Sequence, residues 1–242
     1  MANFSRFAEK PGNLAVVVAF DPGETTGWCA LGVSPEALND SNGDLRAALA
    51  CIEYGQIDCR SQGEGAWRNT VAKHAGLNLA GENDGVSRML DIVARFGDRP
   101  AIVFEDFIPD PKKFDQARHT LSPVRLTSAF CFGLELQGWD LSQIFVQNRS
   151  LAKTTFTDTR LRNIGLYDQS SGPHARDAVR HAFYFLRDTR GDRTNREKAA
   201  EKRHLAWPQF FDDPVSVAAL REKDLSKLRK PKPKGEIIRR LG

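Results

Sequence analysis

Short apolar runs bounded by turn residues divide the chain into five expected strands. The clearest run, Leu14–Phe20, is rich in valine and stops at Asp21-Pro22-Gly23. This pattern predicts a fully buried strand that ends in a turn. Four similar segments predict the remaining strands: Gly27–Leu31, Cys51–Asp58, Ala101–Phe104 and Ser142–Val146.

Apolar residues at helical spacing predict helices between and after these strands. Ser122 followed by Pro123 is typical of a helix start, and this helix would bury Leu126, Phe130 and Leu134 and end near Gly138. Residues 32–49, and residues 60–85 before the first helix, are rich in glycine and polar side chains and are predicted as loops. The other expected helices are Ser87–Phe96, Leu151–Ile164 and Pro173–Arg187. Three strands followed by alternating helices and strands predict an α/β fold, a mixed five-stranded sheet flanked by helices.

The composition is that of a soluble globular protein. The chain has 242 residues, of which 40% are hydrophobic, and this length suits one large core. The longest apolar run is far shorter than the roughly 20 residues that cross a bilayer, and the N-terminus lacks a signal-peptide core. We therefore expect a cytoplasmic protein without membrane contact. The four cysteines form no CxxC pair and are expected to be free, buried thiols.

Charge is distributed unevenly along the chain. Residues 1–186 contain 19 Lys and Arg against 22 Asp and Glu, whereas residues 187–242 contain 16 against 9. A basic segment of this kind favours a polyanionic partner, although such tails are often only solvated. We divide the chain into an N-terminal extension (1–13), a folded domain (14–187) and a basic C-terminal extension (188–242), which we expect either to bind a polyanion such as DNA or to be partly disordered.

Acidic residues stand at the ends of three predicted elements. Asp21 follows the first strand, Glu105 follows the fourth, and His174 with Asp177 opens the last predicted helix. If the first and fourth strands are parallel neighbours, they lie about 4.8 Å apart, and these side chains would meet at one edge of the sheet. Taken singly, each residue is also common in turns or helix starts. Taken together, converging carboxylates favour Mg²⁺ or Mn²⁺ and metal-assisted phosphoryl chemistry.

Three segments of the chain carry a family resemblance. The stretch VVVAFDPGETTGWCAL, the strand AIVFEDF and the helix GPHARDAVRHAFYFLR resemble the RuvC-like Holliday-junction resolvases of the RNase H-like superfamily, most closely the phage-encoded branch. The resemblance spans roughly Leu14 to Arg187, and the intervening loops match only loosely. It implies an RNase H-like sheet and a host-cytoplasm location if the protein is phage-encoded.

The resemblance also implies roles for individual residues. Asp21 is similar to the aspartate that touches two Mg²⁺ ions, which Mn²⁺ would replace, and Glu105 is similar to the second acid. His174 and Asp177 match the closing pair, in which the first member is Asp or His. Because histidine must be neutral to bind metal, we expect cleavage to fall in mildly acidic buffer and His174→Asp to flatten that response.

Basic and aromatic residues near these acids are candidate DNA contacts. The loop after Glu105 offers an aromatic wedge, Phe107 or Phe114, although Phe107 would equally suit the core. Arg149 and Lys153 lie where the family has basic residues facing the scissile phosphate, and Arg180 would flank the site. We expect Asp106 to point away from the acids and His181 to be a packed histidine. The other basic candidates in the loop are Lys112, Lys113 and Arg118.

The resulting hypothesis is a metal-dependent endonuclease that resolves four-way DNA junctions by paired nicks. The helix after Ser122 resembles the family's dimerisation helix, which implies a homodimer acting on branched DNA. One alternative is a nuclease for flaps, forks or RNA–DNA hybrids. Two others are an actin-like or sugar-kinase-like ATPase fragment, because DPGETTG also resembles its phosphate loop, and a non-catalytic DNA-binding module.

Overall fold

Strand β1 (Ala15–Asp21) lies inside a five-stranded sheet in the computed structural model. The structure describes residues 13–39, 44–60, 79–96, 99–107, 122–167, 172–190 and 196–211. The strand order is β3-β2-β1-β4-β5; β2 and β3 run antiparallel to their neighbours, while β1, β4 and β5 are parallel. The other strands are β2 (Thr25–Val33), β3 (Leu49–Asp58), β4 (Ala101–Glu105) and β5 (Ile144–Gln147). The expected mixed five-stranded sheet flanked by helices is confirmed.

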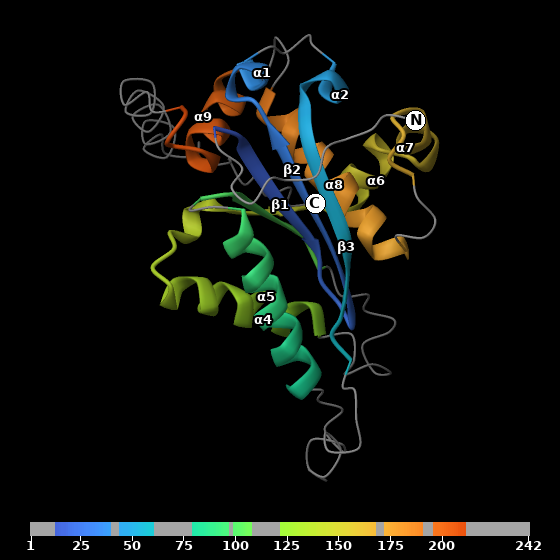
Figure 1. Cartoon of the computed structure of the whole chain (residues 1–242), viewed down its shortest axis with the longest axis vertical. Coiled ribbons are helices and arrows are strands. Elements are labelled where there is room, and N and C mark those ends of the chain that lie inside the picture. Colours follow the sequence, from blue (N-terminus) through green and yellow to red (C-terminus); the bar gives the residue numbers. More distant parts are fainter. Residues whose placement is uncertain are drawn as a thin grey trace, which may run out of the picture.

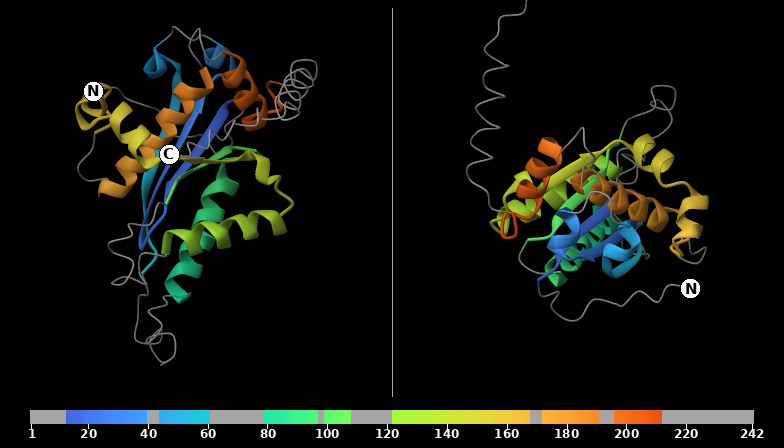
Figure 2. Two further views of the ribbon diagram at one scale, coloured as in Figure 1. Left: turned by 180° about the vertical axis from the view of Figure 1, so that it is seen from behind. Right: turned by 90° about the horizontal axis from the view of Figure 1, so that it is seen from above.

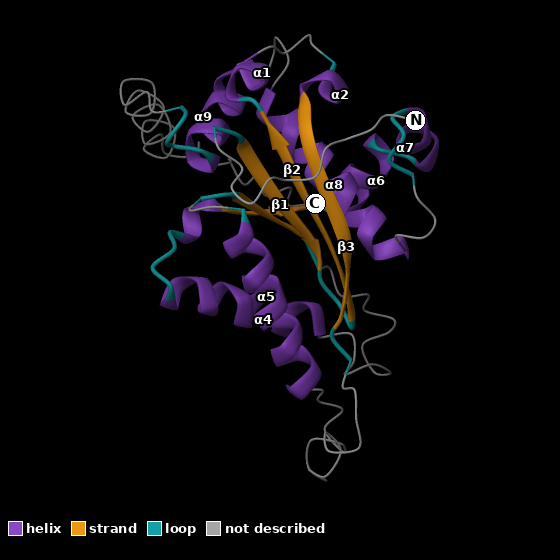
Figure 3. Ribbon diagram, in the orientation of Figure 1, coloured by secondary structure: helices purple, strands orange, loops and turns teal. Residues whose placement is uncertain are grey.

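One face of the sheet is covered by α4 (Leu79–Arg95) and α5 (Ser122–Leu136), which pack against each other (Figures 1 and 3). On this face Phe20 of β1 stacks on Phe104 of β4 at 5.6 Å between ring centroids, and Phe130 of α5 lies 5.4 Å from both. Leu126, Phe130 and Leu134 form the buried stripe of α5, as predicted. Gly138 follows with a φ of 81°, which glycine adopts without strain.

The opposite face is covered by the long helix α8 (Gly172–Arg190) and by α9 (Arg196–Ala206). Two short helices, α6 (Arg149–Thr155) and α7 (Asp158–Asn163), follow β5 on the same side (Figure 2). The expected helix Leu151–Ile164 is therefore divided, because Thr157 caps a new helix by accepting a hydrogen bond from the Arg160 amide.

Two regions predicted as loops contain helices. Residues 32–49 include α1 (Pro35–Asn39) and α2 (Leu45–Ala48), and Leu38 of α1 is fully buried. Helix α4 begins at Leu79 rather than near Ser87. A short 3₁₀ helix, η4 (Leu141–Gln143), leads into β5.

The first part of the expected C-terminal extension belongs to the folded core. Helix α8 continues past residue 187, and α9 packs against it. Trp207, directly after α9, is 0% exposed and donates a hydrogen bond from Nε1 to the Val16 carbonyl oxygen at 2.7 Å. The domain boundary placed at 187 is therefore too early. Residues 212–242 and the N-terminal extension up to residue 12 lie outside the described residues.

All four cysteines are free thiols, as expected, and Cys131 is the one that is only partly buried. Burial raises the pKa of Cys51 to about 11 and that of Cys29 well above its usual value. None of the described helices combines the length and the apolar character needed to cross a membrane.

Candidate metal centre

Strand alternation places three polar side chains on the α8 face of the sheet. In β1 the residues Ala15, Val17 and Ala19 pack on that face, and Asp21 continues the same alternation. In β4, Ala101 and Val103 face α8, so Glu105, two residues further along the strand, lies on the same face. Gln147 of β5 is paired with Glu105 across the parallel ladder. The carboxyl ends of these strands thus present Asp21, Glu105 and Gln147 toward α8.

The first turn of α8 lies directly on β2. Gly27 is paired with Asp21 in the hairpin, and a Cβ atom added to Gly27 would lie 2.0 Å from the His174 carbonyl oxygen. Glycine at this position permits the close approach of two backbones. The contact brings His174 and Asp177 to the strand end that carries Asp21.

Three carboxylates meet at this point. Asp21, Glu105 and Asp177 each offer an oxygen atom, and these atoms all lie within 4.8 Å of one another. Burial raises the pKa of Asp21 above its usual value; the His174 hydrogen bond opposes this effect, and the charges of Glu105 and Asp177 add to the rise. Among the described residues this is the one group of three or more acidic, histidine or cysteine side chains that converge in this way.

His174 lies beside this acidic group but is not part of it. Its Nδ1 atom is 2.8 Å from Asp21 Oδ2, and its side chain is 44% exposed. The hydrogen bond to Asp21 raises the pKa of His174 above its usual value, against the smaller opposing effect of burial. The four residues expected to form the site are therefore adjacent, with His174 attached to Asp21.

Basic side chains from α6 border the carboxylates. Lys153 donates to Asp177 Oδ2 at 2.6 Å and lies 3.9 Å from Glu105 Oε2. Arg149, one helical turn earlier, lies 3.1 Å from Glu105 Oε1 while its side chain remains 66% exposed. Asn148 fixes the start of α6 by accepting from the Ser150 amide at 2.9 Å, so both cations come from a capped helix.

Arg180 makes its contacts inside the protein. Its guanidinium is paired with Asp177 and with Asp158 of α7, and its Nε donates to the Phe156 carbonyl oxygen at 3.0 Å. The side chain is only 11% exposed. Arg180 thus connects α8 to α7 beside the acidic group, and its expected contact with DNA stays a prediction.

Sequence patterns alone did not identify the contact of His181 with the site. The side chain is fully buried, as expected for a packed histidine, but it also contacts Glu105 and Gln147. Its spacing after His174 and Asp177, at i+7 and i+4, places the three residues on one stripe of α8. That stripe is the feature that would have indicated its position.

The remaining DNA-contact candidates are not brought to the site by described contacts. Phe107 lies two residues beyond β4 and is partly buried. Asp106 donates its backbone N–H to the Gln147 carbonyl oxygen at 2.7 Å, and its carboxylate is not in the acidic group. The other loop candidates lie outside the described residues: Lys112, Lys113, Phe114 and Arg118.

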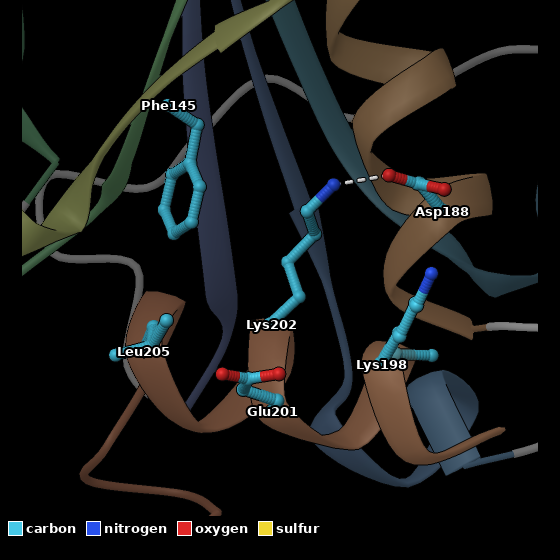
Figure 4. A pocket seen from close by; sticks show the side chains of 7 residues that line it. Phe145, Asp188, Lys198, Glu201, Lys202 and Leu205 are labelled. Atoms are coloured by element: carbon cyan, nitrogen blue, oxygen red, sulfur yellow. Dashed lines mark hydrogen bonds and ion pairs between the residues drawn. The ribbon is translucent and has the colours of Figure 1, made fainter. Parts of the chain in front are cut away.

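A pocket of about 510 Å³ lies at the far end of α8, away from the carboxylates (Figure 4). Lys202 spans it to form an ion pair with Asp188. Asp188 follows Asp177 by 11 residues, or about 16 Å along the helix axis. The lining carries both charge signs and contains no residue of the acidic group: Phe145, Asp188, Lys198, Ala199, Glu201, Lys202 and Leu205.

Comparison with known proteins finds a structural neighbour without a sequence relative. No protein-family model matches the chain, and no curated protein matches it. A solved structure described as T. thermophilus RuvC in complex with Holliday junction substrate matches with a TM-score of 0.43 and 14% sequence identity. The match covers 72% of this chain and 93% of that one. The functional assignment therefore rests on this chain's own side chains.

The acidic group suits a divalent metal ion. Its three members are carboxylates, the hard oxygen ligands that Mg²⁺ and Mn²⁺ prefer. Buried carboxylates that repel one another carry an electrostatic cost, and the raised pKa of Asp21 reflects that cost. A bound divalent cation would offset it. The residues present thus fit a metal centre.

Proposed function

We propose that this protein is a divalent-metal-dependent DNA endonuclease that cuts branched DNA, with the four-way junction as its substrate. The observation that carries the proposal is the convergence of Asp21, Glu105 and Asp177 from β1, β4 and α8. Carboxylates gathered beside cations suit a reaction at a phosphodiester, because the acids can hold metal and the cations can hold phosphate.

The acids are proposed to hold two Mg²⁺ ions, with Mn²⁺ as a substitute. Metal ions in such sites activate a water molecule and stabilise charge on the reacting phosphate. Lys153 and Arg149 border the same carboxylates and would orient the scissile phosphate by charge. His174 would serve as a further metal ligand or as a proton acceptor. Both roles require its neutral form, so cleavage should fall in mildly acidic buffer, and His174→Asp should flatten that dependence.

The choice of DNA as substrate rests on two features of the sequence. The DPGETTGW stretch, the acid after the fourth strand and the HARD helix start resemble junction resolvases. The chain also ends in a basic segment, with 9 Lys and Arg against 3 Asp and Glu in residues 221–242. Such a segment would bind DNA phosphates in a salt-dependent manner. Its removal should then weaken junction binding and reduce the salt dependence.

A homodimer is proposed because α5 carries an exposed apolar stripe. Phe132 is 60% exposed and Leu136 is 72% exposed, and Val124 lies two turns before Phe132. This stripe faces away from Leu126, Phe130 and Leu134, which fill the core. A second copy of the chain would bury it, and two active sites on one junction would give paired nicks.

A cleavage assay with several labelled substrates tests the proposal. The protein would be incubated with a four-way junction, a flap, a fork, an RNA–DNA hybrid and a linear duplex, each with Mg²⁺, Mn²⁺ or EDTA. Symmetric paired cuts in the junction, lost with EDTA and with Asp21→Asn, are the expected result. Preferential cutting of flaps, forks or hybrids would favour the alternative nuclease, and no cutting of any substrate would reject the proposal.

A further inference from the structure

His181 connects Glu105 to the interior of the protein. The residue lies on α8, one turn beyond Asp177, and is 0% exposed. Its Nε2 atom is 3.0 Å from Glu105 Oε2, and its Nδ1 atom is 3.0 Å from Gln147 Oε1. Both ring nitrogens therefore have a polar partner on a neighbouring strand, Glu105 on β4 and Gln147 on β5.

The hydrogen bonds of this chain require a donor toward Glu105. An ionised carboxylate only accepts hydrogen bonds, so His181 Nε2 must carry the hydrogen. In a neutral ring the other nitrogen, Nδ1, then accepts from the Gln147 amide nitrogen after a half-turn of the amide group. In a doubly protonated ring Nδ1 instead donates to the Gln147 oxygen. Among the residues that the structure describes, none is a hydrogen-bond partner of Gln147 Nε2, which suits the half-turn. In either arrangement a His181 N–H points at Glu105.

The two oxygens of Glu105 are held by partners of different mobility. Arg149, at Oε1, has a side chain that is 66% exposed, and long exposed side chains hold a fixed geometry weakly. His181, at Oε2, is enclosed by the core and has one fixed neighbour on each side. The rigid contact, and not the exposed one, therefore fixes the direction of the Glu105 carboxylate.

We propose that His181, itself oriented by Gln147, is a positioning residue that holds Glu105 toward Asp21 and Asp177 and so sets the affinity of the site for divalent metal. The inference rests on the proposed function, because it takes the three carboxylates as the metal ligands. Helix α8 then controls two of the three ligands, Asp177 directly and Glu105 through His181. Removing a residue that hydrogen-bonds to a metal ligand typically weakens metal affinity 10- to 100-fold.

Two substitutions at His181 separate positioning from packing. The amide nitrogen of glutamine lies close to where histidine has Nε2, and that of asparagine close to Nδ1. His181→Gln therefore keeps a donor toward Glu105, whereas His181→Asn keeps only the contact with Gln147. A third variant, Gln147→Met, removes the group that orients the ring. His204→Asn is a matched control, because His204 uses Nδ1 to bond the Phe211 carbonyl oxygen, outside the acidic group.

The readout is the binding of Mn²⁺ to the full-length metal-free protein, measured by electron paramagnetic resonance of the free ion. We expect about 10- to 100-fold weaker binding for His181→Asn, a smaller loss for Gln147→Met, and nearly wild-type binding for His181→Gln and His204→Asn. Thermal unfolding of each metal-free variant is measured in parallel. Positioning is supported if His181→Gln restores Mn²⁺ affinity while its melting temperature is no higher than that of His181→Asn. Better packing alone would not restore the affinity without also raising the melting temperature.

The outcomes distinguish this inference from the proposed function. If the wild-type protein binds no Mn²⁺, the proposed metal centre itself fails. If it binds Mn²⁺ and His181→Asn binds equally well, the positioning role is wrong while the metal centre stands. If His181→Asn does not fold, Gln147→Met decides: unchanged Mn²⁺ affinity in that folded variant overturns the inference, and weakened affinity supports it.

Discussion

Gly27 and His174 are in contact through their backbones, and this contact sets the position of α8 on the sheet. A Cβ on Gly27 would lie 2.0 Å from the His174 oxygen and 2.7 Å from the Ala175 nitrogen. No side-chain rotation can relieve such a clash, because the backbone of residue 27 fixes the position of the Cβ and the atoms that it meets belong to the backbone of α8. Since Gly27 is also the hairpin partner of Asp21, the same contact fixes the distance between the β1 and α8 parts of the site.

Gly27→Ala should therefore separate the carboxylates. The helix start would have to move by more than 1 Å, and a displacement of that size can reduce a reaction rate about 100-fold. Overpacking of this kind should also lower the free energy of unfolding by about 1–3 kcal/mol. Gly23→Ala is the matched control, because its added Cβ would meet only an ordinary contact at 3.6 Å. Equal cleavage rates in the two variants would contradict the assigned role of Gly27.

Asp21→Asn and Asp177→Asn should have opposite effects on the stability of the metal-free protein. Burial, and then the charges of Glu105 and Asp177, raise the pKa of Asp21, so removing the charge of Asp21 should raise the melting temperature in EDTA. Asp177 has Lys153 and Arg180 as partners, so Asp177→Asn removes a carboxylate that neutralises these two cations and should lower the melting temperature. Both variants should lose cleavage. Calorimetry with and without Mg²⁺ checks the expected rise and the expected fall in melting temperature. A lower melting temperature for Asp21→Asn would show that its charge is stabilising.

The Asp21–His174 pair should make the metal-free protein more stable in mildly acidic solution. The hydrogen bond raises the pKa of His174 above 6.5, so the folded state binds a proton more tightly than the unfolded state. This contribution is fully present below the unfolded pKa of about 6.5 and is lost as the pH rises through the higher folded value. His174→Asn keeps a donor near Asp21 but cannot titrate. The melting temperature in EDTA should fall more steeply with rising pH in the wild type than in this variant; parallel curves would reject the linkage.

Simple rules of alternation account for the parts of the site that the sequence predicted. Asp21 and Glu105 each follow a buried run, and in both strands the period of two places them on the same face. His174 and Asp177 share a helix face for the same kind of reason. Because these relations are local, they could be predicted without a structure, given that the first and fourth strands are neighbours.

The contacts that sequence patterns missed depend on the packing of distant elements. Gln147 faces His181 only because β5 lies parallel to β4 with Glu105 opposite Gln147. Arg180 reaches Asp158 only because α7 begins at Asp158, directly after its Thr157 cap, and this helix start comes close to α8. Likewise, α9 is highly charged and its apolar residues show little helical periodicity. Its place in the fold depends on the buried Trp207, which lies just after the end of the helix.

The exposed stripe of α5 gives a direct test of the dimer. Leu136→Asp places a charge on a side chain that is 72% exposed, so it should leave the monomer fold intact while weakening any interface there. Sedimentation should then show a shift from dimer to monomer, with paired junction cuts replaced by single nicks. Leu151→Asp on α6, where Leu151 is 50% exposed, is the control for adding charge at an apolar surface site, and it is compared by sedimentation alone because Leu151 lies between Arg149 and Lys153. A wild-type monomer in solution would reject the dimer.

Trp207 provides the test of where the folded domain ends. Its ring lies 5.8 Å from that of Phe185 on α8, and its Nε1 donates to the Val16 carbonyl oxygen of β1. Trp207→Ala should lower the free energy of unfolding by about 3–5 kcal/mol, the usual cost of removing a large buried aromatic side chain. Trp207→Phe keeps most of the ring but leaves the Val16 carbonyl without its donor, so its smaller loss should be about 1–3 kcal/mol. Chemical denaturation measures both. If Trp207→Ala were as stable as the wild type, the segment after α8 would be an appendage, and the boundary near residue 187 would be restored.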